Sequence, residues 1–165
     1  MALAIYAGTF DPLTDGHLSV VRQAVTLFGH VVVLVADNPE KKTLFDAAER
    51  VELARAALKD LPTASVASTR GMVVDYARSA GAQFLVRGVR GATDAQFEAE
   101  LAAVNRKLAP GIQTVFFPAE ASLQAVSSSR LKEMARRGES LAGVCSPAIA
   151  ERLVNKLASL PPAPK

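Results

Sequence analysis

The sequence predicts an α/β fold, a single-domain, doubly wound sheet of five parallel strands. Short apolar, β-branched runs alternate along the chain with longer segments whose apolar residues recur every three or four positions. Glycine or proline follows most of these segments, where helices and strands commonly end. This alternation favours parallel strands joined by right-handed crossovers, and a chain of 165 residues can bury one core.

The first three expected elements are a strand, a helix and a strand. Leu3–Ala7 is a short apolar run before Gly8 and is expected to be a buried strand. Leu18–Phe28 places its apolar residues on one side of a helix, which Gly29 is expected to end. His30–Ala36 is rich in valine and short enough for a central strand of a parallel sheet.

A helix, a strand and a second helix are expected next. Asp46 and Glu49 have the spacing of a capping box, so a helix is expected from Asp46 to about Leu61. Ser65–Ser68 fits a short strand. Met72–Ala80 has the pattern of a helix and is followed by glycine, which commonly ends one.

Two strands and three helices complete the chain. Gln83–Val86 and Gln113–Phe117 are expected strands on either side of a helix over Thr93–Leu108, which a Pro-Gly pair ends. A helix over Ser129–Arg137 is ended by glycine. The last helix is expected over Pro147–Leu160, because proline suits a first helical turn. Its apolar positions fit either the core or a subunit contact, namely Ile149, Leu153, Val154 and Leu157.

One domain is expected over residues 1–160, followed by a proline-rich tail, residues 161–165, that is expected to be disordered. The net charge of +3 suits small anionic ligands as well as nucleic acid. The single cysteine, Cys145, excludes an intramolecular disulfide and fits a reducing compartment. No targeting segment or apolar run of membrane-spanning length is visible, so a cytoplasmic protein is expected.

Ligands of doubly wound sheets bind beyond the carboxyl ends of the strands, so residues that follow strands are the candidates for a site. The first strand leads through Gly8 to Thr14-Asp15-Gly16-His17 at the start of a helix. The free N–H groups and the dipole of a helix N-terminus favour phosphate, and His17 would add a donor. Gly8 and Gly16 are expected to let a ligand approach the backbone. The alternative, turn glycines beside a solvated histidine, fits this position at the ligand edge less well.

Three further segments offer phosphate-binding groups. Lys41 and Lys42 follow the second strand, Arg87 and Arg90 follow the fourth, and Ser127-Ser128-Ser129 opens a helix after the fifth. Arginine forks bind phosphate oxygens bidentately, and a helix start supplies N–H groups. Each segment alone also fits an exposed lysine pair, a charged loop or a helix cap. Their coincidence on one rim of the sheet favours an anion site.

The Thr14-Asp15-Gly16-His17 segment resembles the T-x-G-H motif of the nucleotidylyltransferase superfamily that carries an HxGH or TxGH signature. The resemblance to one family in it, the bacterial phosphopantetheine adenylyltransferases, extends over nearly the whole chain. The segments that carry it, in order and at the right spacing, are Ala4–Pro12, Lys41-Lys42, Arg87-Gly88-Val89-Arg90, Asn105-Arg106 and Ser127-Ser128-Ser129.

The resemblance implies a Rossmann-like nucleotidylyltransferase fold and transfer of the adenylyl group of ATP to 4′-phosphopantetheine. The products would be dephospho-coenzyme A and pyrophosphate, in coenzyme A biosynthesis. It also implies Mg²⁺ with the ATP, a homohexamer, and feedback by coenzyme A. Because the acceptor phosphate is already largely dianionic at neutral pH, with a second pKa near ~6, direct in-line attack without a covalent enzyme intermediate is expected.

Residue roles follow from the same resemblance. It gives catalytic roles to Thr9, His17, Lys41 and Arg90, with His17 stabilising the transition state. It assigns an ATP site to Thr9, Phe10, His17, Gly88, Val89, Arg90, Glu98, Leu123, Gln124, Ala125, Val126, Ser127, Ser128 and Ser129. It assigns the acceptor site to Thr9, Lys41, Met72, Val73, Arg87, Leu101 and Asn105. The metal is expected on the triphosphate with few or no protein ligands, because Mg²⁺ often keeps its waters.

Three alternatives remain beside this interpretation. A cytidylyltransferase or a nicotinamide-mononucleotide adenylyltransferase would use the same chemistry with other pockets. A non-catalytic nucleotide or coenzyme A sensor would be expected to lack His17 or Lys41, and both are present. A nucleic-acid binder is suggested by four cations on one predicted helix, Arg130, Lys132, Arg136 and Arg137. No base-stacking aromatics are interleaved with them, so a solvated helix face is expected instead.

Overall fold

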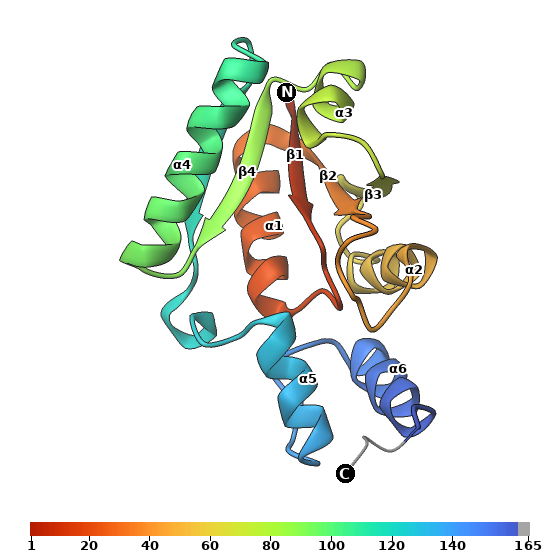
Figure 1. Cartoon of the computed structure of the whole chain (residues 1–165). Helices are drawn as coiled ribbons and strands as arrows, with labels where there is room; N and C mark the ends of the chain where they lie inside the picture. Colours follow the sequence, from red (N-terminus) through yellow and green to blue (C-terminus); the bar gives the residue numbers. More distant parts are fainter. Residues whose placement is uncertain (162–165) are drawn as a thin grey trace.

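Five parallel strands form one sheet in the order β3-β2-β1-β4-β5 in the computed structural model, which describes residues 1–161 (Figure 1). The strands are β1 (Ala2–Gly8), β2 (Gly29–Ala36), β3 (Ala64–Thr69), β4 (Phe84–Val89) and β5 (Gln113–Pro118). This confirms the predicted fold class. The order reverses direction between β1 and β4, which makes their shared carboxyl end the expected place for a ligand. Most of the predicted tail lies outside the described residues.

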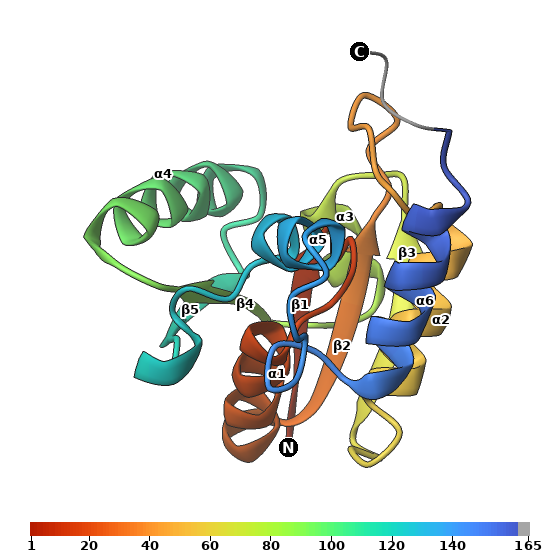
Figure 2. The same cartoon turned by 90° about the horizontal axis from the view of Figure 1, so that it is seen from below.

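Six α-helices and a short 3₁₀ helix connect and follow the strands. They are α1 (Asp15–Phe28), α2 (Ala47–Ala57), α3 (Val73–Ser79), α4 (Ala92–Leu108), η1 (Ala121–Leu123), α5 (Ser128–Arg136) and α6 (Pro147–Ala158). Figure 2 shows α1 and α2 on one side of the sheet and α3 and α4 on the other. Helices α5 and α6 lie beyond the carboxyl ends of the strands, where they extend the rim of the sheet (Figure 1).

Two apolar cores, one on each face of the sheet, follow from the alternation of side chains along β1 and β2. Ala4 and Tyr6 pack on the side of α1, while Ile5 and Ala7 pack on the side of α3. Valine and leucine fill β2 with a continuous buried run, Val31–Val35. A strand buried on both faces is typical of a covered parallel sheet.

Strand β4 is longer than the sequence suggests, and it includes residues predicted to follow it. The expected strand ended at Val86, whereas Arg87 pairs with Phe116 and Val89 with Pro118 of β5. The backbone stays extended as far as Val89 because β5 pairs with it up to that residue. The side chains still alternate, so Arg87 extends to the α4 face and Gly88 to the α1 face.

Several helix ends differ from the predicted ones. Helix α2 ends at Ala57 instead of near Leu61, because residues 58–61 form a turn in which the Leu61 N–H donates to the Leu58 carbonyl. Helix α6 likewise ends at Ala158 instead of Leu160. The predicted capping box of α2 is confirmed, since Asp46 accepts from the Glu49 N–H at 2.8 Å and Glu49 accepts in return at 3.0 Å.

The last helix contributes to the core, which settles part of an open question. Ile149 and Leu153 are fully buried against the α1 side of the sheet, and Cys145 packs beside them. Val154, the next residue of α6, is exposed. No helix within residues 1–161 combines the length and the apolar character needed to cross a membrane.

Candidate active site

A cavity of about 310 Å³ opens at the carboxyl end of the sheet, where β1 and β4 lie side by side. Its walls come from the ends of these two strands, the starts of α1, α4 and α5, and the segment around η1. The N-termini of two of these helices, α1 and α5, therefore direct free N–H groups and partial positive charge toward one space.

Phe10 shapes the floor of the cavity at the end of β1. Its backbone has a φ of 47°, which residues other than glycine rarely adopt. The residue is only 3% exposed. The ring contacts His17 edge-on at 5.1 Å between centroids. A Cβ on Gly8 would lie 2.8 Å from this ring. Gly8 therefore makes room for Phe10, and it also lines the cavity where a ligand is expected to approach its backbone.

The N-terminal cap of α1 holds the His17 ring in one orientation. Thr14 is the N-cap residue, and its own N–H donates to His17 Nδ1 at 3.0 Å. A nitrogen that accepts a backbone hydrogen bond carries no proton. The neutral ring therefore carries its proton on Nε2, which is left to act as a donor. The Thr14–His17 cap thus assigns the tautomer that a phosphate site requires.

His17 is uncharged over the physiological pH range. Burial, with the positive charge of Arg90 acting in the same direction, lowers its pKa to about 4. A neutral imidazole can donate a hydrogen bond from Nε2, but it is unsuited to act as an acid that gives up its charge near neutrality.

This shift predicts a pH-dependent stability. Between a pKa of about 4 in the folded chain and 6.5 in the unfolded chain, only the unfolded state binds the proton. Stability contributed by neutral His17 is therefore complete above pH 6.5 and falls as the pH drops toward 4. The slope is about 1.4 kcal/mol per pH unit in this window. Denaturant unfolding of the wild type and of His17→Gln at several pH values measures it. An equal slope in both proteins would contradict the prediction.

Two arginines at the end of β4 are each held by a carboxylate from α4. Arg87 donates to the Ala7 carbonyl at 2.9 Å and lies 3.4 Å from Glu98. Arg90 lies 3.5 Å from Asp94, which also accepts from the Arg90 backbone N–H. Burial raises the pKa of Glu98, although Arg87 opposes this shift. The α4 carboxylates thus orient both guanidinium groups at the mouth of the cavity.

Gly88 lies between these arginines and gives a test of packing. A Cβ at this position would lie 2.9 Å from Cγ2 of Val20 on α1. Gly88→Ala is expected to lower the free energy of unfolding by about 1–3 kcal/mol, the usual result of overpacking. Gly111→Ala is the matched control, since nothing lies within 4 Å of its added Cβ. Equal unfolding midpoints for the two variants would contradict the prediction.

The serine segment forms the opposite wall. Ser127 caps α5 by accepting from the Arg130 N–H at 3.1 Å, and Ser128 donates to the Pro12 carbonyl at 2.8 Å. The second bond ties the start of α5 to the loop after β1. The serine N-cap predicted as an alternative is present, and it occurs at the cavity. Gly16 approaches this wall closely, since its Cβ would lie 3.4 Å from the Val126 carbonyl oxygen.

The structure brings most, but not all, of the predicted site residues to this cavity. The lining includes Thr9, Phe10, His17, Arg87, Gly88, Arg90, Glu98, Leu123, Val126, Ser127, Ser128 and Ser129. The cavity wall does not include Lys41, Met72, Val73, Val89, Leu101, Gln124, Ala125 or Asn105. Lys41 lies exposed between β2 and α2. Three of the four segments predicted to bind phosphate therefore meet at the cavity, and the lysine pair lies outside its wall.

The sequence interpretation missed three charged groups near the site. Asp94 pairs with Arg90, four residues before it in the sequence. This spacing is typical of ion pairs on a helix and could have predicted the contact. Lys132 was expected on a solvated face, but it donates to buried Asp11 at 2.8 Å. Arg50 is 2% exposed and shares the buried side of α2 with Leu53 and Ala54. The sequence did contain a signal for Arg50, namely a charged residue at a helical position where the pattern places apolar residues.

The cavity offers a metal few protein ligands. Its carboxylates, Asp94 and Glu98, both pair with arginines. Over residues 1–161, no three side chains of histidine, cysteine, aspartate or glutamate are grouped to hold a metal ion. Mg²⁺ favours phosphate oxygens and water, so an ion held by a phosphate group would not require three protein ligands.

Comparison with known proteins agrees with the geometry. A family model described as cytidylyltransferase-like matches residues 5–134. A phosphopantetheine adenylyltransferase of Acidovorax sp. (strain JS42) is 44% identical over 155 residues, which cover 94% of each chain. A protein of the same name from Moorella thermoacetica is 42% identical, over 94% of this chain and 97% of the relative.

A solved structure supports the fold. A nicotinate-nucleotide adenylyltransferase candidate from Vibrio parahaemolyticus superposes with a TM-score of 0.70, over 94% of this chain and 93% of that one. At 19% identity this likeness concerns the fold alone. The sequence relatives are more similar, at 44% and 42% identity, over the same share of this chain. The chain therefore belongs to the phosphopantetheine adenylyltransferase family, among the cytidylyltransferase-like nucleotidyltransferases.

Proposed function

We propose that this chain transfers the adenylyl group of ATP to 4′-phosphopantetheine, giving dephospho-coenzyme A and pyrophosphate. One observation carries the proposal: a neutral histidine donor and two arginines share a cavity with two helix N-termini. Every one of these groups can bind phosphate oxygens. The family to which the chain belongs supplies the identity of the substrates.

The proposed reaction is direct in-line attack by a phosphate oxygen of the acceptor on the α-phosphorus of ATP. The new P–O bond forms as the bond to pyrophosphate breaks, and no covalent enzyme intermediate is needed. The acceptor is already largely dianionic, so no general base is needed either. What the protein supplies is positioning and positive potential. His17 Nε2–H and Arg90 stabilise the charge that develops on the transferring phosphate.

Binding roles divide between the cavity wall and residues outside it. We assign ATP to the cavity wall, together with the neighbouring backbone of Val89, Gln124 and Ala125. We assign the acceptor phosphate to Thr9 and Lys41, and a further acceptor contact to Arg87. The remaining acceptor contacts proposed are Met72, Val73, Leu101 and Asn105. Met72 and Val73 begin α3, and Leu101 and Asn105 lie on α4, the two helices on one side of the sheet.

Magnesium is proposed as a component of the substrate, bound to the triphosphate. When bound, it neutralises charge on the phosphates and so favours departure of pyrophosphate. The protein would hold this complex through His17, Arg90 and the helix N-termini. A cytoplasmic location is proposed as well, since ATP is available there.

The family resemblance is the basis for proposing a homohexamer, and an uncovered apolar surface supplies a candidate subunit contact. Within residues 1–161, α4 is a helix of 17 residues, none of which is buried. It exposes Phe97, Val104 and Leu108, and the neighbouring edge strand exposes Phe116. An apolar face of this kind on a sheet protein is typical of a subunit contact. Coenzyme A, which contains the product, is proposed as a feedback ligand of the same site.

Pyrophosphate release tests the proposed function. It is measured from ATP with Mg²⁺, with and without 4′-phosphopantetheine, and with CTP in place of ATP. Release that needs both ATP and this acceptor is expected. ATP binding without release would show that the acceptor is wrong. Release with CTP at an equal rate would favour a cytidylyltransferase, and failure to bind ATP would contradict the phosphate site itself.

A further inference from the structure

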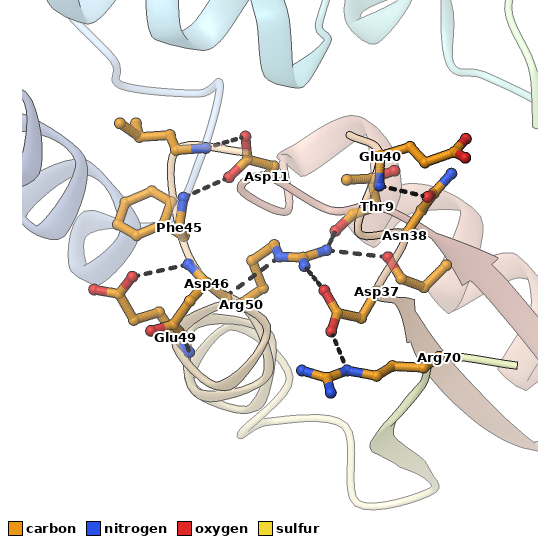
Figure 3. A network of polar contacts seen from close by, with 12 residues as sticks. Thr9, Asp11, Asp37, Asn38, Glu40, Phe45, Asp46, Glu49, Arg50 and Arg70 are labelled. Carbon is orange, nitrogen blue, oxygen red and sulfur yellow. Dashed lines mark hydrogen bonds and ion pairs between the residues drawn. The ribbon is translucent and has the colours of Figure 1, made fainter. Parts of the chain in front are cut away.

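A buried arginine outside the cavity joins the loop after β1 to the end of β2. Arg50 Nη1 donates to the Thr9 carbonyl at 2.9 Å and to the Ala36 carbonyl at 3.1 Å, while Nη2 donates to Asp37 at 2.9 Å (Figure 3). Its Nε donates to the Asp46 carbonyl within its own helix. One side chain thus contacts both strand ends that flank the predicted phosphate rim.

The exposed segment that carries Lys41 is held at both of its ends. At its start, Asp37 pairs with Arg50 and with Arg70 at 2.9 Å each. At its end, the N–H groups of Leu44 and Phe45 donate to the two oxygens of Asp11, each at 2.9 Å (Figure 3). Residues 38–42 between these anchors are exposed. The position of the segment therefore depends on the two anchors.

Both anchors are ionised at neutral pH. Burial would raise the pKa of Asp11, but the bond from Lys132 and those from the Leu44 and Phe45 N–H groups outweigh it and lower the pKa. The hydrogen bond from Arg70 and the charge of Arg50 lower the pKa of Asp37. Each carboxylate therefore keeps its full set of charge-assisted bonds.

We propose that Arg50 is a positioning residue for the acceptor phosphate: it fixes the distance between Thr9 and the Lys41 segment. The inference rests on the proposed function, in which Thr9 and Lys41 bind that phosphate together. Only a planar guanidinium reaches two carbonyls and a carboxylate at once from one buried position. Most of the ATP site, formed by α1, α5 and the end of β4, is built without Arg50, and Thr9 is the one lining residue that it bonds.

The test compares Arg50→Lys with Arg70→Met. Arg50→Lys keeps the buried charge beside Asp37 but loses the fork. It is expected to raise the KM for 4′-phosphopantetheine by about tenfold to a hundredfold, as loss of positioning does. The KM for ATP should stay within about twofold. Arg70→Met is the matched control, because Arg70 bonds the same carboxylate with a side chain that is 86% exposed. Its two KM values are expected to be unchanged.

A second readout does not depend on turnover. Trypsin cleavage after Lys41 or Lys42 under native conditions, identified by fragment mass, reports how firmly the segment is held. We expect cleavage about tenfold faster in Arg50→Lys and unchanged in Arg70→Met. If Arg50→Lys does not fold, Asp37→Asn removes the same ion pair from a partly exposed position and takes its place.

The outcomes separate this inference from the proposed function. A selective rise in the acceptor KM together with faster cleavage supports it. Equal rises in both KM values, or faster cleavage with an unchanged acceptor KM, overturn it. If the wild type does not use 4′-phosphopantetheine, the proposed function has failed. Cleavage then decides by itself whether Arg50 fixes the Lys41 segment, and an unchanged rate would overturn that role too.

Discussion

His17→Ala is expected to lower kcat by about 10²–10³-fold while ATP binding stays measurable. The ring is fixed by the Thr14 N–H on Nδ1 and by the edge of Phe10, so Nε2–H is oriented before the substrate arrives. A donor held in this way costs no reorganisation when charge develops on the transferring phosphate. The other groups of the cavity still bind ground-state ATP, which is why the loss should appear in kcat.

The matched control is His30→Ala, because His30 is the only other histidine and lies exposed on β2. Single-turnover rates at saturating ATP separate chemistry from product release. The control should keep wild-type turnover. A near-normal rate for His17→Ala would exclude the donor role. A lost ability to bind ATP would instead assign His17 to ground-state binding.

The pH profile of activity follows from the same uncharged histidine. With its pKa lowered to about 4 by burial, His17 does not titrate in the range where the enzyme is assayed. The acceptor phosphate does titrate there, with a second pKa near ~6. We expect kcat/KM for the acceptor to rise through that value and then to stay level. A further inflection removed by His17→Gln would show that the histidine changes charge during turnover.

Most of the fold could be predicted from the sequence because its signals are local. The valine-rich run over His30–Ala36 and the capping box at Asp46 need no tertiary information, and both are confirmed. The end of β4 could not be found in this way. Arg87 and Gly88 have no strand pattern of their own, and they are extended only because β5 pairs with them. Tertiary pairing outweighs local propensity at such positions.

The sequence predicted the site residues that directly follow strand ends. It did not predict residues such as Lys132 and Arg50, which contact other residues near the site and do not line the cavity. Motif segments placed His17, Arg90 and Ser127 in one cavity. Lys132 looked like one more cation on a helix, but its partner, Asp11, is 121 residues away in the sequence. Arg50 likewise bonds to carbonyls of Thr9 and Ala36. Every residue has a backbone carbonyl, so the sequence does not indicate which carbonyls accept a hydrogen bond from a side chain. Such contacts can be identified only in the folded structure.

Arg90→Met is expected to lower kcat by about 10²-fold or more, the second large effect at this site. Arg90 lines the cavity that His17 also lines, and its charge helps to keep His17 neutral. The methionine keeps the apolar length of the side chain and removes the charge. His17 therefore becomes easier to protonate in this variant, and the pKa of His17 measured by NMR should rise. Arg130→Met, on the outside of α5, is the control for a lost surface charge.

Asp94→Asn tests whether the carboxylate acts through Arg90. Asp94 accepts from the Arg90 N–H at 3.0 Å and lies 3.5 Å from its Nε, so it orients the guanidinium. The single variant should lower kcat by about tenfold through lost orientation. Because the carboxylate has nothing to orient once the guanidinium is gone, Arg90→Met with Asp94→Asn should be no slower than Arg90→Met alone. A double variant whose loss equals the product of the single losses would show that Asp94 acts independently of Arg90.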